Sequence, residues 1–110
     1  MPLAATEPLA PRDFLILMAL TDGRSHGYAI LQRVAEETDA AVSMDPANLY
    51  RSLRRLSRDG LVHEHGPDAQ RRRHYQLTEM GRSTLAAEAS RLERLVDSAR
   101  AKRLLPASRR

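Results

Sequence analysis

The chain has 110 residues, which allows one compact domain and little more. Hydrophobic residues make up 42% of it and charged residues 29%, so collagen-like, low-complexity and wholly disordered classes are excluded. It contains no cysteine, which excludes a disulfide framework, a thiolate metal cage and a thiol nucleophile. The net charge is +4, and 17 of the 18 basic residues are arginines, which favours a polyanionic partner.

The N-terminal residues lack the basic region and unbroken apolar run of a signal peptide. No stretch approaches the roughly 18 consecutive apolar residues of a membrane-spanning helix. A chain without cysteine also suits a reducing compartment. We therefore expect a cytoplasmic protein with no membrane partner.

Two helices are predicted in the first part of the chain. Residues 1–10 contain two prolines and no apolar period, and are expected to form a flexible arm. Apolar residues recur at helical spacing from Pro11 to Leu20, and Thr21-Asp22-Gly23 ends that helix. Ser25 is expected to cap a second helix over residues 26–38. Its predicted buried stripe consists of Tyr28, Ile30, Leu31, Val34 and Ala35.

A third helix and a β-hairpin follow a short connector over residues 40–44. Asp45-Pro46 marks a sharp helix start, and Gly60 stands where a left-handed residue is expected after a helix over 46–58. Turn-forming residues 66–70 separate Leu61-Val62-His63-Glu64-His65 from a basic segment over 71–77 that can return as a second strand. We expect strands over Leu61–His65 and Arg71–Leu77.

Thr78 is expected to cap a last helix from Glu79 to about Arg103, before Pro106 and a frayed end. The resulting order is helix, helix, helix, hairpin, helix. The predicted fold class is mainly α with a small β-hairpin: a winged helix-turn-helix followed by a long C-terminal helix. The predicted parts are the arm over 1–10, the winged helix-turn-helix over 11–78, the long helix over 79–104 and a disordered tail over 105–110.

The third helix has an apolar side made by Leu49, Leu53 and Leu56, and a basic side opposite. Solvent-exposed helix faces normally mix both charges, whereas here the only acids lie at the two ends. The pattern therefore indicates a recognition helix in a DNA major groove, with a merely solvated face as the alternative. Ala47, Asn48 and Arg51 are the candidates for reading bases, because Asn pairs with adenine and Arg with guanine. Arg54, Arg55 and Arg58 are the candidate phosphate contacts, and Tyr50 either donates to a phosphate or packs beside Leu53.

A second basic cluster follows the hairpin turn. Arg71, Arg72 and Arg73 lie next to His74, and strand alternation would put Arg72 on the opposite face from the other two arginines. A basic hairpin beside a recognition helix is typical of a wing that reaches a phosphate or an adjacent minor groove. The alternative is a hairpin tip that is merely soluble.

These residues resemble the PadR-like transcriptional regulators over residues 14 to about 95. The resemblance is carried by His26-Gly27-Tyr28, by Asn48-Leu49-Tyr50 with Leu53, Leu56 and Gly60-Leu61, and by Arg73 to Gly81. It implies a dimeric winged helix, usually a repressor, with the shorter type of C-terminal extension. It also implies a small hydrophobic effector held between subunits by aromatic side chains. The last helix has no aromatic residue, so such a pocket would be lined by Leu and Ala.

The last helix continues well beyond a winged-helix core, so its apolar side needs a cover. Its apolar residues recur at steps of four and three, as in a coiled coil, which predicts a homodimer; the alternative is that the helix packs back on the first helix. A twofold dimer would present two recognition helices about 34 Å apart and require a palindromic operator in double-stranded DNA. The predicted dimer interface consists of Phe14, Leu17, Met18, Leu85, Ala89, Leu92, Leu95, Val96 and Ala99.

Other chemistries have less support. There is no glycine-rich phosphate loop, no G-x-S-x-G and no H-E-x-x-H, so no enzyme, cofactor or bound metal is expected. Two alternatives remain open. One is a winged-helix module that docks an acidic protein, and the other is a metal-responsive regulator that uses His63, His65 and His74. His26 is interpreted as a helix-start residue.

Overall fold

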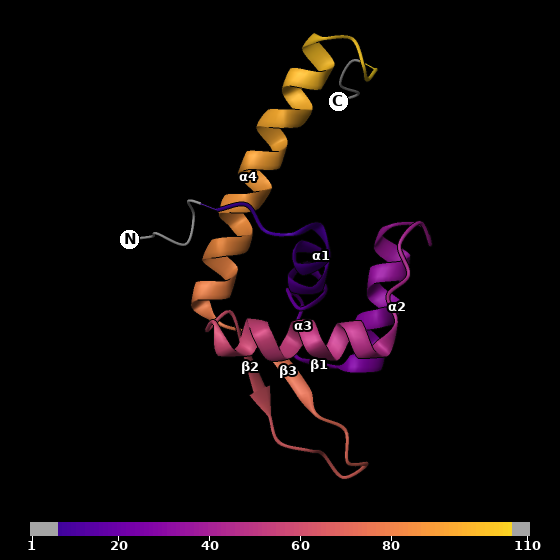
Figure 1. The fold of residues 1–110 in the computed structure, drawn as a ribbon, viewed down its shortest axis with the longest axis vertical. Coiled ribbons are helices and arrows are strands. Elements are labelled where there is room, and N and C mark those ends of the chain that lie inside the picture. Colours follow the sequence, from indigo (N-terminus) through magenta and orange to yellow (C-terminus); the bar gives the residue numbers. More distant parts are fainter. Residues whose placement is uncertain (1–6, 107–110) are drawn as a thin grey trace.

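A computed structural model describes residues 7–106 as four helices and a three-stranded antiparallel sheet (Figure 1). The predicted mainly helical class with a hairpin is confirmed, as is the order of the helices. The predicted arm and tail lie partly outside the described residues. No helix in residues 7–106 is both long and apolar enough to cross a membrane. The elements are α1 (Pro11–Ala19), β1 (Ser25–His26), α2 (Gly27–Glu37), α3 (Pro46–Arg58), β2 (Val62–His65), β3 (His74–Leu77) and α4 (Glu79–Ala101).

The sheet has the strand order β1-β3-β2, with β3 between its two neighbours. Ser25 pairs with Tyr75 and His26 with His74, while Val62 pairs with Leu77 and His65 with His74. The sequence analysis missed β1, because two residues are too short to show an alternating pattern. The added strand joins the start of α2 to the hairpin through its pairing with β3.

Side chains from every element except β1 build one hydrophobic core. The apolar side of α3 is confirmed, since Leu49, Leu53 and Leu56 are at most 1% exposed. Tyr28 is a correction: it was expected in the buried stripe of α2 but is 64% exposed, because the buried side of α2 is made by Gly27, Ile30 and Val34 and Tyr28 projects about 160° away from Ile30. The other buried apolar side chains are Ile16, Leu17, Ala19, Leu20, Ile30, Val34, Leu61, Val62, Tyr75, Leu77 and Leu85.

Side-chain caps set the helix starts. Asp45 accepts a hydrogen bond from the Asn48 N–H at 2.9 Å, and Thr78 accepts one from Gly81 N–H at 2.9 Å, as predicted. The predicted Ser25 cap is wrong: His26 Nδ1 accepts from the Ala29 N–H at 3.3 Å, and Ser25 is buried in β1. Ser25 does not cap α2, because it lies in β1, where it pairs with Tyr75.

The two halves of α4 have different surroundings. Its first turns pack on α1 and the sheet, where Gly81, Thr84, Leu85 and Glu88 are buried. Glu88 accepts hydrogen bonds from Arg91 and from the Leu9 backbone, which hold its pKa below the ordinary value of 4.5. The distal half runs away from the body of the molecule (Figure 1), and Leu95 and Val96 are exposed there. Packing back on the first helix therefore applies to the first half of α4, and the described residues of the protomer leave the distal half uncovered.

Gly81 of α4 packs closely against Leu61, in the loop before β2. A Cβ at this position would lie 2.1 Å from the Leu61 carbonyl oxygen and 3.0 Å from the Leu77 side chain. Gly81→Ala should therefore lower the free energy of unfolding by about 1 to 3 kcal/mol, the usual range for overpacking, despite the better helix propensity of alanine. Chemical denaturation measures this change. Gly66→Ala is the matched control and should be nearly neutral, because nothing lies within 4 Å of a Cβ there.

Candidate nucleic-acid interface

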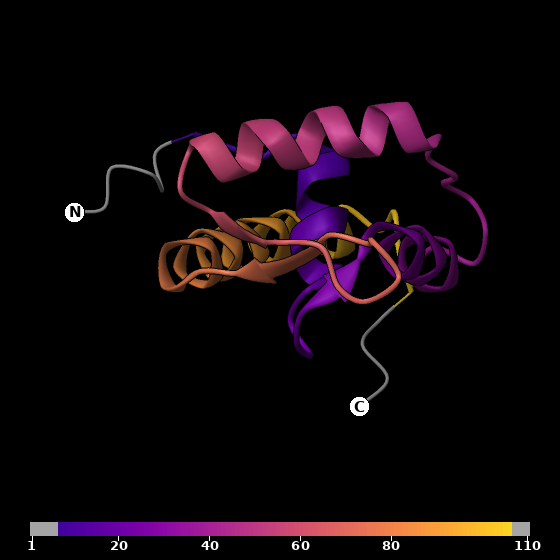
Figure 2. The ribbon, with the colours of Figure 1, turned by 90° about the horizontal axis from the view of Figure 1, so that it is seen from below.

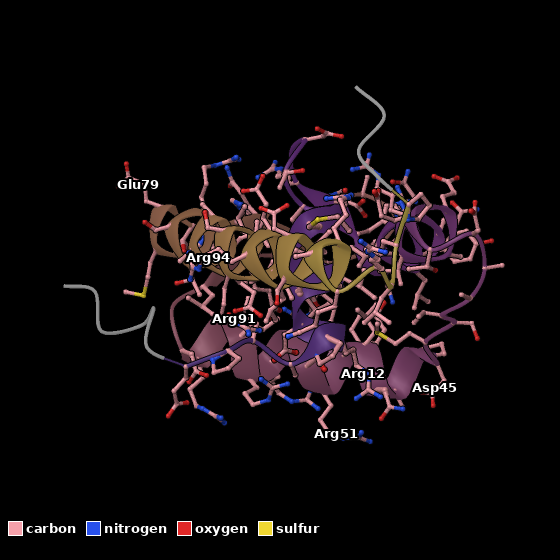
Figure 3. The ribbon with its side chains drawn as sticks, turned by 90° about the horizontal axis from the view of Figure 1, so that it is seen from above. Arg12, Asp45, Arg51, Glu79, Arg91 and Arg94 are labelled. Carbon is pink, nitrogen blue, oxygen red and sulfur yellow. The ribbon has the colours of Figure 1, made fainter. Side chains whose placement is uncertain are left out.

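The basic side of α3 is exposed along its length. Arg51, Arg54 and Arg58 are exposed at about one-turn intervals, and Ala47 is exposed before them. Figure 3 shows Arg51 pointing away from the body of the molecule on the outer side of α3. Arg58 lies 3.8 Å from Asp59, whereas Arg51 and Arg54 form no ion pair within residues 7–106. Their two charges are therefore available to an anion outside the chain.

Asn48 is half-buried and already engaged within α3. Its Nδ2 donates to Asp45 Oδ2 at 3.1 Å, and its Oδ1 accepts from the Arg51 guanidinium. The capping residue thus orients Asn48, which in turn orients Arg51. Such a chain of hydrogen bonds limits the rotamers of both predicted base readers before any partner binds.

Arg55 differs from the other arginines of α3. Its guanidinium donates to both carboxylate oxygens of Asp13 in α1, at 3.0 and 3.1 Å, and Asp13 is only 5% exposed. The hydrogen bond from Arg55 to Asp13 raises the pKa of Arg55. Sequence analysis grouped Arg55 with the outward arginines, and missed Asp13 as its partner. No local signal indicated this partner, because the two residues are 42 positions apart in the sequence.

Tyr50 lies between α3 and the start of α2. Its ring is 41% exposed, and its hydroxyl sits where a Cβ on Gly27 would be, at 2.3 Å from that ideal position. Only glycine leaves room for the Tyr50 side chain here. The neighbouring Tyr28 is exposed on the same side, so the two tyrosines flank the first turn of α2.

Asp68 organises the loop between β2 and β3. Its carboxylate accepts hydrogen bonds from the Gln70 and Arg72 backbone N–H groups at 2.8 and 2.9 Å, from Arg72 Nε at 3.2 Å and from His74 Nε2 at 2.8 Å. The sequence analysis treated this aspartate only as a turn residue. The signal was present, because an Asp in a turn commonly bonds the backbone two residues later.

The predicted second strand over Arg71–Leu77 is wrong in its first three residues, since β3 starts at His74. Arg71 has a φ of 66°, and Asp68 holds the Arg72 backbone in the turn, so these residues cannot continue the ladder. The expected alternation of the three arginines across a strand therefore fails. Arg72 is paired with Asp68 and Arg73 with Glu64, whereas Arg71 forms no ion pair in the described part of the chain.

The wing and the helices enclose a cavity of about 640 Å³, which we call the wing cavity. It lies between the first turn of α2, α3 and the hairpin loop. Four arginines and one glutamate surround it, so its charge is positive. Seen from the hairpin end, α3 runs along one side of this loop (Figure 2). The lining residues are His26, Gly27, Tyr28, Tyr50, Arg54, Glu64, Arg71, Arg72, Arg73 and Tyr75.

The histidines form two pairs on the outer side of the sheet. The rings of His63 and His65 are 4.6 Å apart, and those of His26 and His74 are 5.7 Å apart. His65 is further engaged by Gln76 at 2.8 Å, and His74 by Asp68. Among residues 7–106 no three His, Asp or Glu side chains are placed to hold a metal ion, so the metal-responsive alternative gains no support.

The predicted dimer residues divide between core and surface. Leu17 is a correction, because it is 0% exposed within the protomer and has no surface to offer a partner. Phe14 and Met18 are half-buried and line a groove of about 590 Å³ with Leu85 and Ala89, between α1, α2 and α4. Farther along α4, Leu92 and Ala99 are half-buried and Leu95 and Val96 are exposed.

The Transcriptional regulator PadR-like family matches residues 16–87, which span α1 to the first turns of α4 and include the wing cavity. The chain belongs to the PadR-like family. A protein of transposon Tn4556 from Streptomyces fradiae, described as an uncharacterized 37.1 kDa protein, is 40% identical over 86 residues, 76% of this chain. The PadR-like chain spans only 23% of the length of that relative.

Solved structures show the same fold. A transcriptional regulator from Clostridium thermocellum is 27% identical, with a TM-score of 0.71, over 82% of this PadR-like chain and 86% of its own. Bacillus subtilis PadR in complex with operator DNA is 24% identical, with a TM-score of 0.63, over 70% of this chain and 45% of its own. The winged-helix fold and the PadR-like membership predicted from the sequence are therefore confirmed.

The wing of this PadR-like chain depends on the charge of Asp68. The hydrogen bond from His74, followed by that from the Arg72 backbone, holds the pKa of Asp68 well below its ordinary value of 3.8. A lowered pKa means that Asp68 stabilises the wing fully above pH 3.8, and that this contribution is lost as the pH falls through the folded-state pKa. An NMR titration of the Asp68 carboxyl carbon should give a midpoint well below 3.8.

Asp68→Asn is the companion variant, since it keeps one acceptor oxygen and removes the charge. Amide exchange at Arg72 should be faster in this variant at neutral pH, while exchange within α1 should be unchanged. A carboxyl midpoint at or above 3.8 would show that the wing does not depend on this charge.

Proposed function

We propose that the chain is a homodimeric, sequence-specific DNA-binding repressor of transcription in the cytoplasm. Each subunit inserts α3 into one of two successive major grooves of a palindromic operator. The observation that carries this proposal is the wing cavity, because α3 and the hairpin bring Arg54 and Arg71 to one opening with no carboxylate partner in residues 7–106. The operator complex of Bacillus subtilis PadR, which has the same fold, supports double-stranded DNA as the polyanion.

The residues of α3 divide into two roles by position. Ala47, Asn48 and Arg51 occupy its first turns and read base edges, since the first turns of a recognition helix approach the floor of the groove. Arg54 and Arg58 come later and contact phosphates, together with the Tyr50 hydroxyl. Arg71 is the wing residue with a charge free for phosphate. Arg72, Arg73 and His74 are bonded to Asp68 or Glu64, and they contact DNA from the wing either with these bonds in place or after breaking them.

Residues 11–78 serve as the DNA-binding unit and residues 79–104 as the dimerisation helix. The distal half of α4 supports this division, because Leu95 is 53% and Val96 is 41% exposed with no cover from the protomer. Phe14, Met18 and Ala89 extend the same surface onto the body, whereas Leu85, also predicted in the interface, is buried in the core. A second copy of the chain would bury this apolar stripe, with Leu92 and Ala99 also in the interface.

The groove between α1, α2 and α4 is our candidate for a small hydrophobic effector. Its floor is apolar, with Phe14, Met18 and Leu85, and its rim carries Arg33 and Glu37. It adjoins the proposed dimer surface, so an occupant would alter how the two subunits meet.

The salt dependence of binding tests the role of the arginines. If about four phosphates are neutralised per subunit, log affinity should fall with log salt at a slope of roughly −7, measured by fluorescence anisotropy on a duplex selected from a random pool. Arg51→Ala should weaken the selected duplex by about 1 to 3 kcal/mol and relax one base position. Arg71→Ala should instead weaken selected and scrambled duplexes alike, because Arg71 is the wing arginine with a charge free for phosphate.

A slope near zero would count against DNA as the partner and favour the alternative of an acidic protein bound to the same face. Unchanged affinities after Arg51→Ala would remove Arg51 from the base readers and leave the rest of the proposal in place.

Val96→Asp tests the dimer. A buried, uncompensated charge in the α4 interface should weaken dimerisation by about 3 kcal/mol, measured by sedimentation equilibrium. Ser90→Asp is the matched control, because Ser90 is exposed about 140° around α4 from Leu85 and should leave dimerisation unchanged. Equal dimerisation in both variants would place the interface elsewhere.

A further inference from the structure

The contact between α1 and α3 contains one directional element. The rest of it is apolar packing of Leu49, Leu53 and Leu56, which is non-directional and tolerates a small rotation of the helix. Among the side-chain hydrogen bonds of residues 7–106, the two from Arg55 to Asp13 are those that join α3 to another helix. A planar guanidinium that meets a carboxylate through two parallel bonds fixes distance and orientation together.

We propose that Asp13 is a positioning residue that sets the rotation of α3 about its axis. Arg55 connects α3 to Asp13, and we call this ion pair the strut. Arg55 is therefore not a phosphate contact. This inference rests on the proposed function, because it concerns how α3 meets DNA. Arg55 is then not among the arginines that neutralise phosphates. Asp13, a residue of α1 that does not touch DNA, becomes a determinant of sequence specificity.

The geometry of a helix explains why the rotation matters. Arg55 follows Arg51 by four residues, so the two side chains project about 40° apart from the same helix. At a helix radius of about 6 Å, a rotation of about 10° moves a side chain by about 1 Å, which exceeds the roughly 0.5 Å tolerance of a preorganised site. Holding Arg55 therefore holds Arg51 and Asn48 at the positions from which they approach base edges.

The burial of Asp13 keeps Arg55 bound to it when DNA phosphates compete for the Arg55 guanidinium. Asp13 is 5% exposed, so removing Arg55 to a phosphate would leave a buried carboxylate without its partner. Arg54 and Arg51 have no such partner in the described residues, and they meet phosphates or bases without that penalty. The neighbouring arginines 54 and 55 thus differ in role although they are adjacent in sequence.

The experiment compares three full-length variants on two duplexes, the one that the wild-type protein selects from a random pool and a scrambled duplex of equal length. Asp13→Asn with Arg55→Gln replaces the ion pair by an amide pair and leaves no buried charge unpaired. Arg55→Lys keeps the charge pair but loses the two-point contact. Arg54→Gln is the matched control for loss of one α3 charge, and circular dichroism checks that each variant is folded.

The double variant should bind the selected duplex about tenfold more weakly, bind the scrambled duplex equally well, and keep the wild-type salt slope. Arg55→Lys should reduce the preference for the selected duplex in the same direction. Arg54→Gln should weaken both duplexes and make the slope shallower by about 2 for the dimer, since one phosphate per subunit contributes about 0.9.

Two outcomes would overturn the inference. If the double variant lowers the salt slope as much as Arg54→Gln does, Arg55 contacts a phosphate. If it changes neither slope nor preference, the strut does not set the rotation. In both cases the wild-type protein still selects a duplex, so failure of the inference is distinguishable from failure of the proposed function, in which no duplex is selected at all.

Discussion

The burial of one side of α3 is the interaction on which the rest of the structure depends. Leu49, Leu53 and Leu56 lie on the side of α3 that packs against α2 and β2, and they are almost inaccessible to solvent. Because the side chains of a helix project at fixed angles, burying this apolar side puts Arg51, Arg54 and Arg58 on the outer side of α3, and the finer rotation is left to the proposed Asp13–Arg55 contact. The hydrophobic core thus determines which charges the molecule presents, even though no core residue is charged.

Local signals predicted the four helices and the hairpin, but they missed the two-residue β1 and failed where residues distant in the sequence determine the structure. Asp45 and Thr78 cap their helices as expected, because each cap acts on a backbone N–H three residues away. The Arg71–Arg73 segment was misassigned to a strand because the Asp68 side chain holds it in a turn through bonds that periodicity does not show. The Asp13–Arg55 pair joins residues 42 positions apart, and nothing local to either residue predicts it.

The basic residues of the interface are not equivalent, although the sequence presents them as two uniform clusters. Within residues 7–106, carboxylates hold Arg55, Arg72 and Arg73, and leave Arg51, Arg54 and Arg71 without an ion pair. Paired arginines shape the helix and the wing, and unpaired ones carry the charge that an anion meets. A count of positive residues therefore overstates the field of this face, because Asp13, Glu64 and Asp68 cancel part of it.

Because α4 is continuous from Glu79 to Ala101, the orientation of its first turn also sets the direction in which the side chains of its distal half project. Gly81 fits against the Leu61 carbonyl, so the first turn is locked to the sheet, and each added or deleted residue beyond it would turn the distal apolar stripe by about 100°. For the proposed dimer, length changes that keep this stripe facing the partner helix are therefore restricted to sets near whole turns, such as seven residues. Insertions of other lengths would turn the stripe away from the partner helix.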